Sequence, residues 1–420
     1  MMIATSPATS FPAPSYRNAR LLLVLAILAA LLNSTAPSPI YQTYIAHLQL
    51  PQIAGAAIFA FYAVGTLCAL LAAGRFGDRV RDRRKIIIPG LVIVALGAGV
   101  FALADSLGML LLGRFLAGLG TGAIAGTATA AIYDLERPER RQHAAVIATV
   151  GFTLGATLGP VLTSIALYFD VWPLVTPFAT IAVTAVACAI GLVRAAWPPV
   201  SSVAVAVVDP ELAVPPCEAE AVTRRLASPF LLAASALSIS WVVGSLLMAL
   251  GPAIAVDVFH LPSVALAGLM PAAFQLSAGI GQYLFGKLTA LRAIRIGLIG
   301  LAAISVLLLV GAEMASLPIL ILAMPAYGLA YGAAFVGGAG LVNETAVPKH
   351  RARTVSRFYI CGYLSNAFPV LALGSLVDAL GLHDSLRIYT VFVLACLAAI
   401  MLLAWQPSIA RAAGRPASAA

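Results

Sequence analysis

Twelve long apolar stretches separated by short polar connections dominate this chain and decide what it can fold into. A helix needs roughly 20 mostly apolar residues to cross a bilayer, and only 10% of the residues are charged, against roughly 25% in a soluble domain. The stretches are continuous rather than alternating, which favours helices over a β-barrel. The sequence therefore predicts an all-α integral membrane protein with twelve transmembrane helices. We place them near 20–45, 52–74, 86–104, 107–133, 142–168, 172–194, 228–256, 262–287, 294–314, 317–343, 354–379 and 385–405.

The two halves of the chain repeat each other at an offset of about 210 residues. Asp134 is followed by a proline and then by bases, and Glu344 is followed by the same pattern. Gly74-Arg-Phe similarly matches Gly286-Lys-Leu. Duplicated halves are typical of transporters whose substrate site lies between the repeats. We therefore expect two pseudo-symmetric six-helix bundles.

A proline-rich and acidic stretch divides the two halves. It predicts a cytoplasmic linker at 195–227, because it is too polar to span the membrane. The expected organisation is an N-terminal tail at 1–19, a first bundle at 20–194, a second bundle at 228–405 and a C-terminal tail at 406–420.

The positive charges give the orientation in the membrane. All but two of the 25 Lys and Arg residues fall in tails and loops that face one side. Cytoplasmic loops carry such an excess of Lys and Arg, so the expected location is the inner (plasma) membrane with both termini cytoplasmic. The net charge of +9 is explained by this asymmetry and does not indicate nucleic-acid binding. The two exceptions are Arg114, inside a span, and Arg387, at an outer end.

The loop after the second span begins with Gly74, continues with Asp78 and Arg79 and ends in a cluster of bases. This pattern resembles motif A of the major facilitator superfamily, although Arg81 and Asp82 stand where that family usually has one glycine. The resemblance covers nearly the whole chain and implies a charged latch that joins the halves when the transporter faces outward. The alternative is that these charges only anchor loops on the inside. The expected latch residues are Gly74, Asp78, Arg79, Arg83, Asp134 and Arg357.

Arg114 lies within the fourth span, followed at spacings of four by Gly118 and Gly122. A buried arginine costs at least about 2.5–3.5 kcal/mol on insertion scales, so it needs a compensating partner or water. The pattern resembles motif B of the same superfamily, which implies that Arg114 takes part in proton coupling. The alternative is an arginine that extends to the lipid headgroups.

The fifth span carries Gly151, Gly155, Gly159 and Pro160. This stripe resembles motif C, which is associated with the drug:proton antiporter branch, and it implies a bendable hinge. The family's usual glycine pair is replaced here by Thr163 and Ser164. The alternative is that the glycines only allow helices to pack closely.

Polar and aromatic residues near the middle of the spans are candidates for lining a substrate cavity. Aromatic walls with few fixed charges suit amphiphilic or moderately hydrophobic ligands, and cations through the ring faces. The alternative for each is ordinary packing or an interfacial aromatic belt. The candidates are Asn33, Tyr62, Trp241, Gln275, Tyr327, Tyr331, Tyr363 and Asn366.

Several kinds of chemistry have no signature in the sequence. No span carries a carboxylate deep in its interior, although Asp257 and Glu313 lie near span ends. A proton relay through Arg114 is therefore a hypothesis that lacks an identified carboxylate. There is no phosphate-binding loop of the Walker type, no nucleophile–base constellation, no metal-ligand spacing and no disulfide framework. We expect neither an enzyme nor a cofactor or metal.

The sequence favours a secondary transporter that exports small organic or drug-like molecules by alternating access, coupled to protons. The close alternative is transport of a specific metabolite such as a sugar or an organic acid. A transport-dead sensor on the same fold is a third possibility. The expected partners are a small-molecule substrate, protons and the lipid bilayer, without nucleic acid, and we expect a monomer.

Overall fold

The computed structural model describes residues 16–76, 80, 82–136, 141–198, 216–346 and 351–407. Within these ranges, only the backbone is described for 73–76, 141–145, 216–227 and 351–353. The described residues form helices and connections without a strand. Twelve of the helical segments are long and apolar enough to cross a membrane, which confirms the predicted fold class.

The first half contains six spans. The first span combines α1 (Arg17–Thr35), a 3₁₀ turn (Ser38–Ile40) and α2 (Tyr41–His47), because Pro37 and Pro39 interrupt the α-helix. The other five spans are α3 (Gln52–Phe76), α4 (Arg84–Ala102), α5 (Leu107–Asp134), α6 (Arg141–Tyr168) and α7 (Thr176–Arg194).

The second half repeats this arrangement. Its spans are α8 (Pro216–Ala253) with a π-helical turn (Ile254–Val258), α9 (Val264–Ala267) joined to α10 (Leu269–Phe285), α11 (Ala290–Glu313), α12 (Leu317–Thr345), α13 (Arg351–Leu380) and α14 (Leu382–Ala404). Because α8 begins at Pro216, residues 216–227 of the predicted linker are helical.

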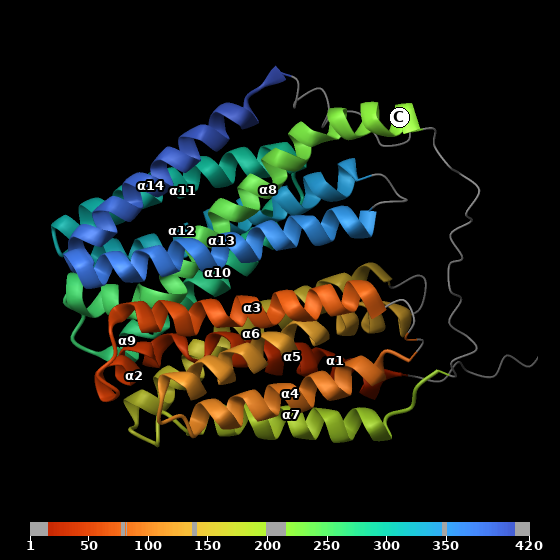
Figure 1. The fold of residues 1–420 in the computed structure, drawn as a ribbon, viewed down its shortest axis with the longest axis horizontal. Helices are drawn as coiled ribbons and strands as arrows, with labels where there is room; N and C mark the ends of the chain where they lie inside the picture. The colour runs from red at the N-terminus through yellow and green to blue at the C-terminus, as the bar shows by residue number, and fades with distance from the viewer. Residues whose placement is uncertain are drawn as a thin grey trace, which may run out of the picture.

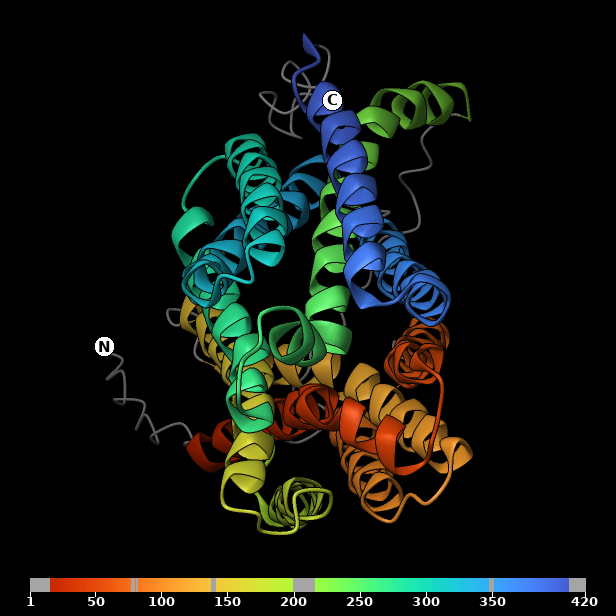
Figure 2. The same cartoon turned by 90° about the vertical axis from the view of Figure 1, so that its left-hand side faces the viewer.

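Figures 1 and 2 show the two halves as separate bundles that lie one above the other. The repeat is visible in single contacts. The guanidinium of Arg84 lies over the ring of Trp197, 5.1 Å from its centroid, and that of Arg295 lies over Trp405 at 4.8 Å. Arg84 begins the third span of the first half, Arg295 lies in the second turn of the third span of the second half, and each tryptophan follows the sixth span of its half. The halves are therefore related in their packing as well as in their sequence.

The bundles have two distinct ends. We call the end where α7 stops and α8 starts the linker end, and the opposite end, with α2 and α9, the far end (Figure 1). Polar contacts join the halves at the far end. The Asp378 carboxylate in α13 accepts hydrogen bonds from the backbone N–H groups of Gln52 (2.7 Å) and Ile53 (2.9 Å) at the start of α3. Ser38 donates a buried hydrogen bond of 2.6 Å to the Met248 carbonyl oxygen in α8.

The Met248 carbonyl is available for this contact because of a proline. In an α-helix it would accept a hydrogen bond from the N–H four residues later, but that residue is Pro252, which has none. A buried carbonyl without a partner would destabilise the fold. The Ser38 hydroxyl of the other half therefore satisfies a group that α8 leaves open.

Candidate functional site

An aromatic cluster lies between the two halves, about midway along the helices. The Trp241 and Tyr363 rings meet edge to face with centroids 4.7 Å apart, and Trp241 and Tyr359 lie 6.4 Å apart. Because α13 packs directly on α3, the Tyr363 side chain also lies near Tyr62 and Thr66 of the first half, and near Tyr331 of α12. We call this set the interface cluster; its members are Tyr62 and Thr66 of α3, Trp241 of α8, Tyr331 of α12, and Tyr359 and Tyr363 of α13.

Two glycines make room for the largest rings of the interface cluster. A Cβ at Gly244 would lie 3.2 Å from the Tyr331 ring, and a Cβ at Gly362 would lie 3.1 Å from the Trp241 ring. Trp241, Tyr331 and Tyr363 remain half-buried despite their mid-helix positions. The cluster therefore combines close ring packing with partly exposed aromatic surface.

Arg114 lies beside this cluster, buried in the first half with 1% of its surface exposed. Its Nη1 donates to the carbonyl oxygens of Ser34 (2.8 Å) and Asn33 (3.3 Å), and its Nε donates to that of Ile58 (3.4 Å). The guanidinium also lies over the ring of Tyr62, 4.8 Å from the centroid. The side chain is thus directed at the backbone of α1 and α3 and does not extend to the membrane surface.

Two of the three carbonyls that receive Arg114, those of Asn33 and Ser34, belong to the last turn of α1, where helical carbonyls lack partners. The Asn33 carbonyl would normally bind the N–H of residue 37, which is a proline. A cation at a helix C-terminus also gains from the partial negative charge there, about half an elementary charge. The end of α1 therefore compensates part of the charge of Arg114.

The glycines after Arg114 allow α3 to approach α5 closely. A Cβ at Gly118 would lie 2.0 Å from the Tyr62 carbonyl oxygen, and one at Gly122 would lie 3.0 Å from that of Thr66. Only glycine permits α3 and α5 to approach this closely. The spacing of Arg114, Gly118 and Gly122 thus places the guanidinium against Tyr62, a member of the interface cluster.

Two donors in this region have no hydrogen-bond partner in the part of the chain that the structure describes. They are Nη2 of Arg114 and Nε1 of Trp241, and both are buried. Both atoms can only donate. Native structures rarely leave buried donors unpaired. The buried Tyr41 hydroxyl lies close to the Arg114 guanidinium and can serve it as an acceptor, so Nε1 of Trp241 is the donor for which the described residues offer none.

Four of the predicted cavity residues, Tyr62, Trp241, Tyr331 and Tyr363, belong to the interface cluster. Gln275 and Asn366 are half-buried and make no side-chain hydrogen bond within the described residues. Gln275 lies one turn before Gly279, which packs against Thr153 of α6 in the other half. Asn366 lies about one turn after Tyr363. Both therefore share a helix face with a residue that contacts the opposite half.

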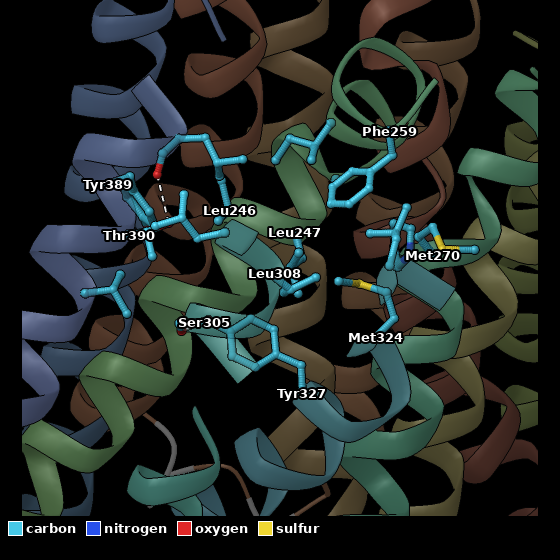
Figure 3. A pocket seen from close by; sticks show the side chains of 17 residues that line it. Leu246, Leu247, Phe259, Met270, Ser305, Leu308, Met324, Tyr327, Tyr389 and Thr390 are labelled. Atoms are coloured by element: carbon cyan, nitrogen blue, oxygen red, sulfur yellow. Dashed lines mark hydrogen bonds between the residues drawn. The ribbon is translucent and has the colours of Figure 1, made fainter. Parts of the chain in front are cut away.

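Asn33 and Tyr327 are placed differently. Asn33 is buried within the first half, where its amide donates to the Val94 carbonyl oxygen of α4 at 3.3 Å. Tyr327 is buried within the second half, and its hydroxyl lies 2.6 Å from that of Ser305. Tyr327, Ser305 and Met324 line a mostly apolar cavity of about 50 Å³ there (Figure 3), which has room for a few water molecules only.

The glycine stripe of α6 faces α1 in its own half. A Cβ at Gly155 would lie 2.8 Å from the Leu28 carbonyl oxygen, and one at Gly159 would lie 2.9 Å from the Ala36 nitrogen. Gly151 lies opposite Val24 of α1. The helix continues through Pro160 to Tyr168. In this structure the stripe thus packs α6 on α1, and a hinge role for these four residues stays a prediction.

The described latch residues do not join the two halves. Arg83 donates from Nε to the Asp134 carboxylate at 2.7 Å, which links the start of α4 to the end of α5 within the first half. Arg357 is exposed near the start of α13. Asp78 and Arg79 lie outside the described residues, and only the backbone of Gly74 is described. The latch therefore stays a prediction.

Asp82 forms a second charge pair at the linker end. Burial favours its neutral form, but hydrogen bonds from the Arg84 side chain and backbone N–H, with the charges of Arg84 and Lys85, lower its pKa below the ordinary value. The shortest of these hydrogen bonds are 3.0 Å. Asp82 thus stays ionised and holds the first turn of α4.

The acidic residues whose side chains the structure describes all lie in connections or within three residues of a helix end. Asp257 is exposed at the far end, and Glu313 pairs there with Arg387 at 2.5 Å and with His383. Neither therefore supplies a carboxylate at the interface cluster. No group of three or more potential ligands for a metal ion occurs in the described ranges.

The family follows from a comparison of the whole sequence. The family model of the Major Facilitator Superfamily matches residues 23–369 and 263–419. The chain belongs to the Major Facilitator Superfamily. It is accordingly a multi-pass membrane protein from a superfamily of transporters, and its two bundles are the two halves of that fold.

Individual members of the superfamily resemble the chain over different lengths. The inner membrane transport protein YajR of Escherichia coli K12 is 38% identical over 79 residues, which cover 19% of this chain and 17% of YajR. The multidrug resistance protein MdtL of E. coli O45:K1 is 35% identical over 83 residues, 20% of this chain and 21% of MdtL. Thus the chain matches about a fifth of the length of these relatives.

A solved structure shares the fold over nearly the full length. A bacterial homologue of the human lysosomal transporter Spinster, in an inward-facing and occupied conformation, aligns with a TM-score of 0.76. The alignment covers 94% of this chain and 100% of that chain, with 18% sequence identity. This likeness concerns the fold alone.

Sequence reasoning missed three residues of this region. Thr66 and Tyr359 belong to the interface cluster, and Asp378 joins the halves at the far end. Tyr359 could have been found from its spacing of four before Tyr363, which places both rings on one helix face. Asp378 gave no comparable signal, because its partners are backbone N–H groups.

Proposed function

We propose that this protein is a secondary active transporter of a bacterial inner membrane that exports small organic or drug-like molecules by alternating access. The observation that carries the proposal is the interface cluster, which draws residues from both halves to the middle of the spans. In such transporters, the substrate site lies at the interface between repeats. The partial match to a protein named for multidrug resistance supports export.

The proposed orientation places the linker end in the cytoplasm, because that end carries most of the arginines. The contacts of Asp378 and Ser38 then close the outer side. In the opposite state these contacts would separate, and the latch around Asp78 and Arg357 would close the inner side. A substrate bound at the interface cluster would thus be accessible from only one side of the membrane at a time.

Protons are the proposed driving ion, with Arg114 as the coupling residue. Arg114 lies against Tyr62, so a change at the substrate site reaches it through one ring contact. Because an arginine stays charged in proteins, it would act on the proton through its field. The proton itself would be carried by another group.

The test is transport in liposomes that contain a pH-sensitive dye and the purified protein under an imposed proton gradient. A panel of lipophilic cations, antibiotics, sugars and organic acids would be added. Substrate-triggered proton movement that is lost in Arg114→Ala and kept in Arg387→Ala, an exposed arginine at the far end, would support the proposal. Silence of the folded wild-type protein across the panel would contradict proton-coupled export of such molecules.

A further inference from the structure

The interface cluster presents a hydrogen-bond donor that lacks an acceptor. Nε1 of Trp241 is buried, unpaired within the described residues, and lies on a ring that contacts both Tyr359 and Tyr363. Nη2 of Arg114, beside the cluster, also makes no hydrogen bond of normal geometry, but the buried Tyr41 hydroxyl lies close to that guanidinium, so Trp241 carries the argument. A ligand that brings an oxygen acceptor would satisfy such a donor, whereas a ligand with an ammonium group would leave it unpaired.

The local charge points in the same direction. The guanidinium of Arg114 is compensated by the carbonyls at the end of α1, which amount to about half a charge. The acids of the described chain lie at helix ends, away from the middle of the spans. A net positive field therefore remains beside Tyr62, and the burial of Arg114 limits the screening of its charge by solvent.

Aromatic rings alone would also suit a cation, because their faces carry negative charge. In this cluster, however, the guanidinium of Arg114 already lies over the ring of Tyr62. A second cation close to that ring would be repelled by the first. The ring surfaces of Trp241 and Tyr363 thus serve to hold an apolar body, and the charge favours an acceptor at its end.

We propose that the interface cluster binds flat, apolar organic molecules that end in a carboxylate or a neutral oxygen acceptor, and that it discriminates against organic cations. This substrate class rests on the proposed transport function. Trp241 is the specificity-determining donor. Arg114 is a positioning residue that acts through Tyr62 and through its charge.

The experiment uses three probes that share one ring system and differ in charge: 2-naphthoate, 2-naphthamide and 2-naphthyltrimethylammonium. Binding to the purified full-length protein is measured by equilibrium dialysis. We expect naphthoate and naphthamide to bind at least tenfold more tightly than the ammonium compound. Trp241→Phe keeps an aromatic ring but removes the donor, so it should weaken the binding of naphthoate and naphthamide about fivefold. Trp197→Phe, at the linker end, is the control and should leave the binding of all three probes unchanged.

Because Arg114 adds positive charge beside the cluster, naphthoate should bind more tightly than naphthamide, and Arg114→Gln should remove that preference. If this variant does not fold, Trp241→Phe alone carries the test. Equal or tighter binding of the ammonium compound would overturn the proposal, and so would an unchanged profile in Trp241→Phe or the failure of all three probes to bind. Transport of cations in the liposome panel would overturn this substrate class and leave the transport function intact.

Discussion

The Asp378 carboxylate accepts a hydrogen bond from the backbone N–H of Gln52 at 2.7 Å and so joins the last turn of α13 to the first turn of α3. A carboxylate at a helix N-terminus satisfies free N–H groups and interacts favourably with the helix dipole. Because the two residues belong to different halves, this contact exists only while the far end is closed.

Replacing Asp378 with Asn should shift the protein toward a state that is open at the far end. Asparagine keeps one acceptor oxygen but loses the other and the charge at the start of α3, which costs about 0.5–1 kcal/mol and corresponds to about a two- to fivefold change in the ratio of the two states. Spin labels at Val171→Cys and Met314→Cys, in a background without the native cysteines, would report the distance across the far end. Asp384→Asn is the control, because Asp384 is exposed and pairs with Arg387 in its own half. An equal shift in both variants would contradict the role of Asp378.

Gly118→Ala should destabilise the fold, because the added Cβ would lie 2.0 Å from the Tyr62 carbonyl oxygen. Overpacking of this kind costs about 1–3 kcal/mol, and the backbone of α3 cannot rotate away. Gly126→Ala on the same helix is the matched control, since its Cβ would meet nothing within 4 Å. There we expect an unchanged or slightly higher stability, because alanine favours helix. Thermal unfolding in detergent measures both, and equal midpoints would refute the packing argument.

Arg114→Lys should destabilise the first half although the charge is kept. The guanidinium reaches carbonyls on two helices, Asn33 and Ser34 on α1 and Ile58 on α3, whereas one ammonium group has a different geometry. Leaving a buried carbonyl unpaired costs about 1–3 kcal/mol. Arg387→Lys, in an exposed ion pair, should change the unfolding midpoint little. An unchanged unfolding midpoint in Arg114→Lys would contradict this argument and show that only the charge of the residue matters.

The lowered pKa of Asp82 predicts that the stability of the fold depends on pH. Its pKa in the folded protein lies below the unfolded value of about 3.9, because the Arg84 side chain and its backbone N–H favour the ionised form despite partial burial. The contribution to stability is therefore fully present above the unfolded pKa and is lost as pH falls through the folded pKa. The difference in unfolding midpoint between wild type and Asp82→Asn should be constant near neutral pH and shrink in acid. A difference that stays constant from neutral pH down into acid would contradict this role of Asp82.

The spans and the two halves could be predicted because their signals lie in composition and charge. Long apolar runs, the inside arginines and the repeated motifs do not depend on which helix face is buried. The candidate site could be predicted only in part. In lipid, both faces of a helix are apolar, so sequence periodicity does not separate the face that packs from the face that lines a site.

Tyr327 and Tyr331 illustrate this limit. They are four residues apart in α12 and both pack against Phe274, yet Tyr327 bonds to Ser305 inside its own half while Tyr331 joins the interface cluster. The partners of Arg114 were hidden for another reason. They are backbone carbonyls, two of them released by the end of α1 and by Pro37, and a search for charged side chains does not find them.

The central claim is that the interface cluster between the halves is the substrate site. The most direct test compares two tyrosine variants in the proton-gradient liposome assay, with the best substrate of the panel. Tyr363→Phe removes a hydroxyl from the cluster and should raise the KM several-fold, whereas Tyr327→Phe removes a hydroxyl from the second half's own packing and should leave the KM unchanged. A raised KM in Tyr327→Phe with a normal KM in Tyr363→Phe would contradict the account and place the substrate within the second half.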